Sequence, residues 1–255
     1  MTTKLLNREP ALENIRQHGF FDDFFSYTDA QLWTLAAGTG TGTAAVIAPG
    51  DAVNGSGGIL RITTGATDND EEYLYTTNEL WKVANDKPIM AIARLRLTQS
   101  GANRSAFVFG LVDAPADNLI VSDEGGLATG KHGALFYKPS ASAVLTLRST
   151  AVTAAGNFAN NDATERSTGT GWEKYVILIE TLSGTDKRIT FHLDENGGQE
   201  WHQLKDTSGR LIKHYWTLDD TAAGTGELAL VFGVKSNHAS AQILDADYIG
   251  AWQLR

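Results

Sequence analysis

Short segments of the chain alternate apolar and polar residues with a period of two. This is the spacing of a β-strand with one buried side and one solvent-facing side. Ala93, Leu95 and Leu97 alternate with arginine and threonine, and residues 60–63 and 189–194 follow the same pattern. The pattern predicts short strands, not helices, through most of the chain.

Three further segments are apolar at nearly every position: Ala106–Val112, Tyr175–Ile179 and Leu228–Val234. A strand with two apolar faces is covered on both sides. We therefore expect these segments to be central strands, or strands at a contact with another subunit. After one of the alternating strands comes Asn196-Gly197, a pair that favours the tight turn of a β-hairpin.

Clusters of Gly, Asn, Asp and Thr separate about a dozen such strands. The sequence shows neither strand–helix alternation nor an internal repeat. This organisation predicts an all-β fold, an antiparallel jelly-roll sandwich of two sheets. The chain has 255 residues, enough to bury one large core. We expect a single sandwich domain over residues 26–255, preceded by an N-terminal arm over residues 1–25.

The predicted arm has a different composition. Charged and amide residues surround its few apolar residues, and Pro10 restricts any helix to about Ala11–His18, so the arm should contain little helix. Four phenylalanines lie between Phe20 and Phe25, and they pack either on the domain's own core or on a neighbouring subunit. The arm residues expected to contact a capsid or another subunit are Leu5, Leu6, Leu12, Ile15, Phe20, Phe21, Phe24 and Phe25.

The chain is acidic, with 21 Lys and Arg against 30 Asp and Glu and a net charge of -9. Nucleic-acid surfaces and polybasic membrane surfaces need clustered positive charge, so we expect neither as a partner. No apolar run approaches the ~18–20 residues of a spanning helix, and Met1–Pro10 lacks the apolar segment of a signal peptide. There is no Cys, which excludes disulfides, thiolate metal sites and Cys nucleophiles.

The motifs that carry catalysis are incomplete. Asp245 and Asp247 have the spacing that places two carboxylates on one face of a strand, but the Glu-x-Asp-x-Glu arrangement of some glycoside hydrolases is absent. The segment Gly38–Thr43 lacks the Lys-Ser/Thr ending of a phosphate loop, and neither a Gly-x-Ser-x-Gly elbow nor a zinc-type His pair occurs. We therefore expect no enzyme activity, no catalytic residue and no cofactor.

The densest acidic segment is Asp68–Glu72. Carboxylate oxygens are the ligands that Ca²⁺ prefers, but Tyr73 occupies the position where an EF-hand loop requires Gly. Two interpretations stay open: a solvated loop, which we expect, and a calcium site. No metal ligand is assigned from the sequence.

Six tryptophans are present. In a sandwich, most tryptophans fill the core, whereas an exposed indole offers a flat surface on which a sugar ring can stack. Trp172 follows a Gly-Thr-Gly loop and Trp81 precedes a lysine. These two are the candidates for glycan stacking.

Several segments, in order, resemble the concanavalin A-like, laminin-G-like jelly rolls of tailed-bacteriophage structural proteins. The resemblance covers roughly residues 20–255 and rests on degenerate patterns, so no catalytic or ligand residue follows from it. The segments are Phe21-Asp22-Asp23-Phe24 leading to Trp33, Ile89–Thr98, Phe107–Asp113, Gly133–Lys138, the pair Tyr175–Leu182 and Arg188–Glu195, Leu228–Val234, and Asp247–Trp252.

The resemblance implies a non-enzymatic virion protein, a capsid decoration or cement protein that binds the major capsid shell and stabilises it. Such a protein is part of the virion, which is assembled in the host cytoplasm. Its partners are the major capsid protein or other virion proteins, and it is a homo-oligomer, with a trimer favoured. The alternative is a carbohydrate-binding module or a receptor-binding, lectin-like component of the head or tail.

Overall fold

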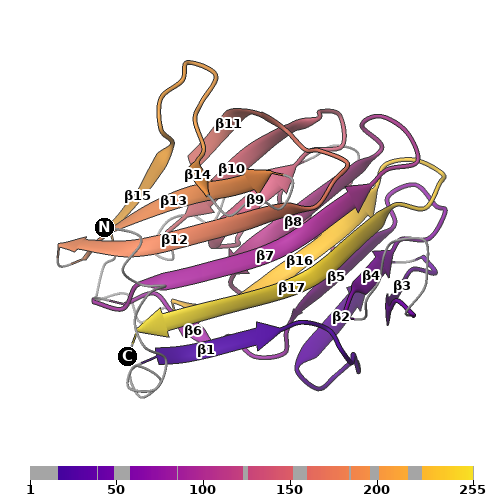
Figure 1. Cartoon of the computed structure of the whole chain (residues 1–255), viewed down its shortest axis with the longest axis horizontal. Helices are drawn as coiled ribbons and strands as arrows, with labels where there is room; N and C mark the ends of the chain where they lie inside the picture. The colour runs from indigo at the N-terminus through magenta and orange to yellow at the C-terminus, as the bar shows by residue number, and fades with distance from the viewer. Residues whose placement is uncertain are drawn as a thin grey trace.

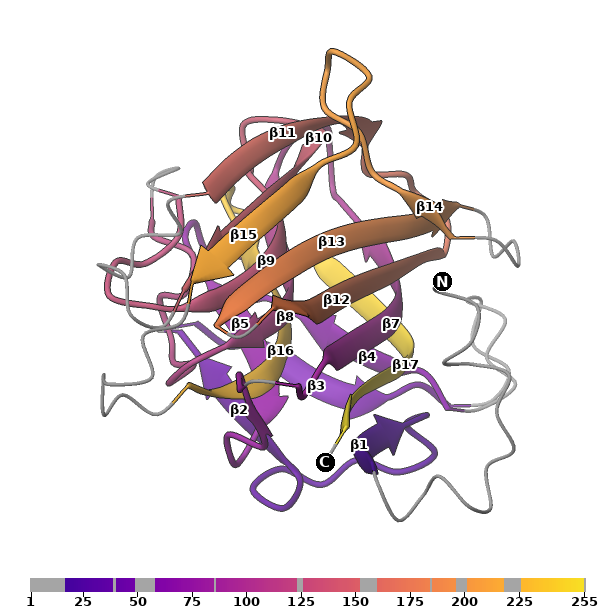
Figure 2. The same ribbon diagram turned by 90° about the vertical axis from the view of Figure 1, so that its left-hand side faces the viewer.

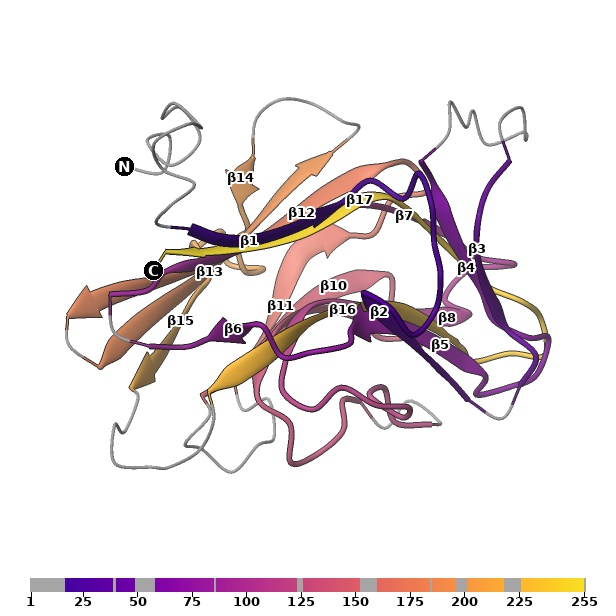
Figure 3. The ribbon, with the colours of Figure 1, turned by 90° about the horizontal axis from the view of Figure 1, so that it is seen from below.

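The computed structural model describes residues 17–38, 40–48, 58–84, 86–122, 126–151, 160–183, 185–195, 201–217 and 226–254. Within these ranges every regular element is a β-strand. The strands form two antiparallel sheets that face one another as a sandwich, as predicted (Figures 1 and 3). Among the described residues there is no helix of the length and hydropathy that crossing a membrane would need.

One sheet has nine strands. In Figure 2, β15, β13, β12 and β7 follow one another across it. Its order is β14 (His202–Gln203), β13 (Asp186–Glu195), β12 (Glu173–Ser183), β7 (Ile89–Thr98), β17 (Ile243–Leu254), β4 (Leu60–Thr63) and β3 (Thr43–Val46), with β1 (Gln17–Asp22) paired to β17 and β15 (Lys213–Thr217) paired to β13.

The other sheet has eight strands and lies behind the first in Figure 1. Its order is β11 (Asn160–Ser167), β10 (Val144–Thr150), β9 (Gly133–Lys138), β8 (Ser105–Val112), β16 (Glu227–Ser236), β5 (Glu71–Thr76) and β2 (Trp33–Ala37), with β6 (Trp81–Lys82) paired to β16.

Side chains follow the predicted alternation. On β7, Ala93, Leu95 and Leu97 are buried in the core between the sheets, while Arg94 and Arg96 lie on the outer side. The doubly apolar strands β8 and β16 are central, as expected. Their outer sides are covered by residues 113–122 and 126–131 of the chain itself, which contribute Leu119 and Ile120 to a second apolar cluster.

The N-terminal segment differs from the predicted arm where the structure describes it. Residues 17–22 form β1, an edge strand paired with β17 from Gln17 opposite Leu254 to Asp22 opposite Ile249. His18, which was expected to end a helix, lies in this strand. The main-chain groups of β1 find their hydrogen-bond partners in β17, a segment distant in the sequence. Four residues of the expected contact set, Leu5, Leu6, Leu12 and Ile15, lie outside the described residues, as does the Asn196-Gly197 turn.

Candidate functional site on the outer face of the nine-stranded sheet

Trp252 lies flat on the outer face of the nine-stranded sheet. It stands opposite Gly19 of β1, and a Cβ atom on Gly19 would overlap the five-membered part of the indole. A Cβ on Gly250 would lie 2.8 Å from Cη2, at the other end of the ring system. Both glycines therefore leave room for the indole to lie along the sheet, and Trp252 is partly exposed.

Two more aromatic rings adjoin Trp252. Phe21 is 53% exposed, and its ring lies 6.1 Å from that of Trp252 and 5.8 Å from that of Tyr248, with an angle of 31° between planes in both cases. We call Phe21, Tyr248 and Trp252 the aromatic platform. Ile92, Val176 and Leu178 are buried beside it, so the platform rests on a firm apolar support.

A bulge in β17 places polar groups next to the platform. The register with β7 shifts between Ala246 and Tyr248, which leaves Asp247 as an extra residue. Bulges of this kind redirect side chains, and Asp247 accepts a hydrogen bond from Arg94 at 2.5 Å. Both groups are about one third exposed, at 30% and 31%. Burial raises the pKa of the neighbouring Tyr248 to about 12, so its hydroxyl is a neutral donor near pH 7.

Trp172 extends this polar area. The guanidinium carbons of Arg94 and Arg96 lie 5.0 and 4.9 Å from the centre of its ring, within the range of cation–π attraction. Arg96 is itself held by Asp245, at 2.6 Å. Trp172, predicted from the sequence as a stacking residue, is partly exposed.

The prediction of Trp81 as a stacking residue is wrong. Trp81 is fully buried and lies against Phe20, with 6.4 Å between ring centres, because β6 pairs with β16 and turns the indole into the core. No sugar can reach it. Trp252 is a site residue that the sequence pattern did not single out, although Tyr248, Gly250 and Trp252 stand at alternate positions on one strand.

The four phenylalanines of the predicted contact set separate into two groups. Phe24 is fully buried, and Phe20 packs on Trp33 with 5.2 Å between ring centres. Phe21 and Phe25 are 53% and 74% exposed. Only the second pair offers surface to another molecule, because the strand period turns Phe20 inward and Phe21 outward.

The two aspartates considered for catalysis are both held by arginines. Asp245 accepts hydrogen bonds from Arg61 at 2.8 Å and from Arg96 at 2.6 Å, and its side chain is fully buried. Asp247 is paired with Arg94. Such carboxylates are fixed as charge partners, since their oxygens already accept hydrogen bonds from guanidinium groups.

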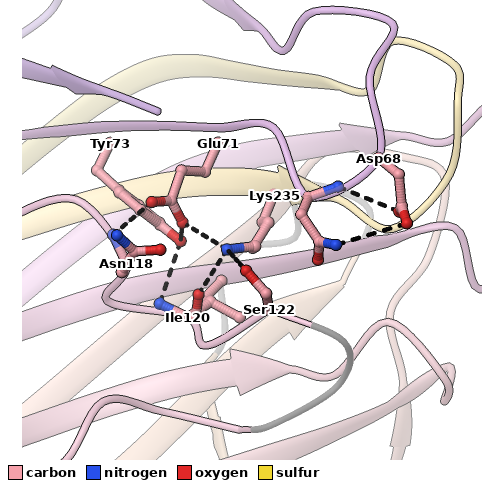
Figure 4. Close-up of polar contacts among 8 residues, drawn as sticks. Asp68, Glu71, Tyr73, Asn118, Ile120, Ser122 and Lys235 are labelled. Carbon is pink, nitrogen blue, oxygen red and sulfur yellow. Dashed lines mark hydrogen bonds and ion pairs between the residues drawn. The ribbon is translucent and has the colours of Figure 1, made fainter. Parts of the chain in front are cut away.

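The acidic segment is not a solvated loop, which corrects that expectation. Asp68 is exposed, but Asp70, Glu71 and Glu72 are each at most 1% exposed. Glu71 accepts hydrogen bonds from Tyr73 Oη at 2.8 Å and Lys235 Nζ at 2.9 Å, as Figure 4 shows. Within the described part of the chain, no three His, Cys, Asp or Glu side chains converge as metal ligands.

Comparison with known proteins supports the fold. No protein-family model and no curated protein sequence matches the chain. Peanut lectin has a similar structure, with a TM-score of 0.58, 10% identity, and coverage of 93% of this chain and 97% of the lectin. An endo-1,3-beta-glucanase from Streptomyces sioyaensis has a TM-score of 0.56 and 15% identity, covering 97% and 98%. The carbohydrate recognition domain of Emp47p has a TM-score of 0.55 and 8% identity, covering 97% and 100%.

These similarities identify the fold as a concanavalin A-like jelly roll, as predicted. At such low identities the likeness extends to the fold alone. The three structures are two lectin-type proteins and one glucanase, and none of them is a phage virion protein.

Proposed function

We propose that this protein is a non-catalytic, carbohydrate-binding protein whose ligand stacks on the aromatic platform of Phe21, Tyr248 and Trp252. The observation that carries the proposal is the flat seat of Trp252 on Gly19 and Gly250. The carbon-bound hydrogens of a sugar ring form an apolar face that suits the outward face of an indole.

Specificity requires polar partners beside the stacking surface. The Arg94–Asp247 pair adjoins Tyr248 and is partly exposed, so it offers both donors and acceptors to sugar hydroxyls. Few ligand-binding surfaces need more than a small number of such groups. The lectin-type names of the neighbouring structures also favour this function.

The proposal excludes glycoside hydrolysis at this face. A hydrolase needs one acid that can give a proton and a second that acts as base or nucleophile. Asp245 and Asp247 are instead bound by arginines, which stabilise both as charged partners.

A glycan array with the full chain tests the proposal, followed by calorimetry with the glycan that binds. Trp252→Ala should weaken binding about tenfold, a change of about 1.4 kcal/mol, because the sugar ring loses its stacking surface. Trp172→Ala should weaken it as well, because Arg94 loses its support. Tyr215→Ala is the matched control: Tyr215 is a 58% exposed aromatic residue on β15, away from the platform.

Circular dichroism and the melting temperature must show that Trp252→Ala is folded, and Trp252→Phe should recover part of the affinity. Absence of binding to any glycan would overturn the proposal, and so would equal affinities for Trp252→Ala and Tyr215→Ala. If the platform variants instead convert an oligomer into a monomer, the platform is a subunit contact and not a sugar site.

A virion structural role is the second candidate. The observation that favours it is the exposure of Phe21 and Phe25, next to the N-terminal segment expected to contact a capsid. In this proposal the protein is a homo-oligomer, a trimer by preference, on the major capsid shell of a phage assembled in the host cytoplasm. Mass spectrometry of purified particles tests it, and absence of the chain from particles would reject it.

A further inference from the structure

Two buried carboxylates lie at the end of the sandwich where the loop from β2 to β3 passes. Glu72 shares the inward side of β5 with Leu74, because residues two apart on a strand face the same way. Asp70 comes immediately before this strand. Glu72 is 0% and Asp70 1% exposed.

Glycines make room for both groups. A Cβ atom on Gly40 would overlap the Asp70 carboxylate, and one on Gly42 would overlap the Glu72 carboxylate. A Cβ on Gly65 would lie 2.7 Å from Asp70 Oδ2, and the Gly65 amide donates a hydrogen bond to this oxygen. The backbone of segment 40–42 is therefore in close contact with both carboxylates, an approach that only glycine permits. The segment that resembles a phosphate loop in sequence thus surrounds acidic side chains.

No cation in the described part of the chain balances these charges. Lys235 lies on β16, the strand paired with β5. It forms an ion pair with Glu71, on the opposite side of β5 from Glu72. Both carboxylate oxygens of Glu72 and Oδ1 of Asp70 have no hydrogen-bond partner of normal geometry, and neither does the hydroxyl of Tyr27.

Buried charges in proteins are paired or coordinate a metal. We propose that Asp70 and Glu72 bind a hard divalent cation, Ca²⁺ by preference, beside the backbone of Gly40 and Gly42. Ca²⁺ takes six to eight oxygen ligands in flexible geometry, and backbone carbonyls and water commonly complete its shell beside two carboxylates. Mg²⁺ demands strict octahedral geometry, and Zn²⁺ prefers nitrogen and sulfur ligands.

The site is independent of the aromatic platform, which lies on the outer face of the other sheet. Its effect is on stability: a cation that binds only the folded chain raises the melting temperature with its concentration. It also links the backbone of residues 40–42 to β5.

The experiment compares melting temperatures of the full chain in EDTA and in CaCl₂, with calorimetry of Ca²⁺ binding. Wild type should melt at a higher temperature in Ca²⁺. Glu72→Gln should lose at least tenfold in Ca²⁺ affinity, yet melt in EDTA at or above the wild-type temperature, because it removes an unbalanced charge. Asp70→Asn should lose the Ca²⁺ response as well. Glu180→Gln, in a surface ion pair about one third exposed, is the matched control and should keep the response.

Binding of Tb³⁺, detected by luminescence excited through aromatic residues, gives a second readout that Ca²⁺ competition should reverse. Equal melting temperatures in EDTA and Ca²⁺, together with no heat of binding, would overturn the proposal. A Ca²⁺ response that Glu72→Gln retains in full would overturn it too. If Glu72→Gln raises the melting temperature equally in both buffers, no cation balances the carboxylate and the proposal is wrong.

Discussion

Lys235 and Glu71 form an ion pair with an Nζ–Oε2 distance of 2.9 Å, although their side chains are only 1% and 2% exposed. Lys235 also donates hydrogen bonds to the Ile120 carbonyl at 2.9 Å and to Ser122 Oγ at 3.2 Å. Glu71 accepts a hydrogen bond from the main-chain N–H of Asn118. The pair therefore fastens segment 118–122 over the outer side of the eight-stranded sheet (Figure 4).

Lys235→Met should destabilise the protein by about 3–5 kcal/mol, because it leaves Glu71 buried without a charge partner. Arg188→Met is the matched control. Arg188 pairs with Glu180 at 3.0 Å, but both side chains are about one third exposed, so its loss should cost less than about 1 kcal/mol. Urea unfolding curves measure both values.

The double variant Glu71→Gln, Lys235→Met should regain part of the stability, since it removes both buried charges. Trypsin should also cleave Lys235→Met faster than wild type after Lys131, as residues 118–122 lose their attachment. Similar unfolding free energies for Lys235→Met and Arg188→Met would contradict this account of the pair.

Protonation of His214 should lower the stability of the protein as the pH drops below about 6.5, the usual pKa of histidine. Burial lowers the pKa of His214 in the folded chain, against an opposing effect of Asp162. The neutral ring forms hydrogen bonds with Ser149 Oγ at 2.7 Å and Asp162 Oδ2 at 3.0 Å, and it packs edge-to-face against Phe191. The unfolded chain takes up the proton first. The stabilisation by neutral His214 is therefore fully present above the pKa of the unfolded chain, and it is lost as the pH falls towards the pKa of the folded chain.

His214→Gln isolates this effect. Unfolding free energies of wild type and variant, measured from pH 8 to pH 4.5, should differ most near neutral pH and converge on acidification. Other acid-sensitive groups, including His192, are common to both proteins and cancel in the difference. A difference that is constant across this range would show that His214 does not titrate on unfolding.

Gly19→Ala should reduce glycan affinity by about tenfold, a change of about 1.4 kcal/mol, without removing an aromatic group. The added methyl group would overlap the indole of Trp252 and tilt it away from the sheet. Gly169→Ala is the control, because its Cβ would meet no atom within 3.0 Å. Near-ultraviolet circular dichroism should change for Gly19→Ala alone, and unchanged affinity would show that the seat of Trp252 is unimportant for binding.

The strands with strong local patterns could be predicted from the sequence. Arg94 and Arg96 at alternate positions identified β7, and continuous apolar residues identified β8 and β16 as central strands. β1 could not be recognised, since Gln17–Asp22 has no alternation and becomes a strand only by pairing with residues 249–254.

The candidate sites depend on contacts between residues distant in the sequence. Glu71 and Lys235 are 164 positions apart, and Trp252 becomes a platform only because β1 brings Gly19 opposite to it. The burial of Asp70 and Glu72 follows from the glycines of another loop, so composition alone made this segment look solvated. Local patterns predict strands, but they do not show which side chains a sandwich brings together.

β17 is the last strand of the chain, and it pairs with β7, β4 and β1 in the interior of the nine-stranded sheet. During synthesis, β1, β4 and β7 emerge from the ribosome long before the segment that joins them. Co-translational folding of this sheet must therefore wait until β17 has left the ribosome, and the early strand edges are exposed to self-association or chaperone binding in the meantime.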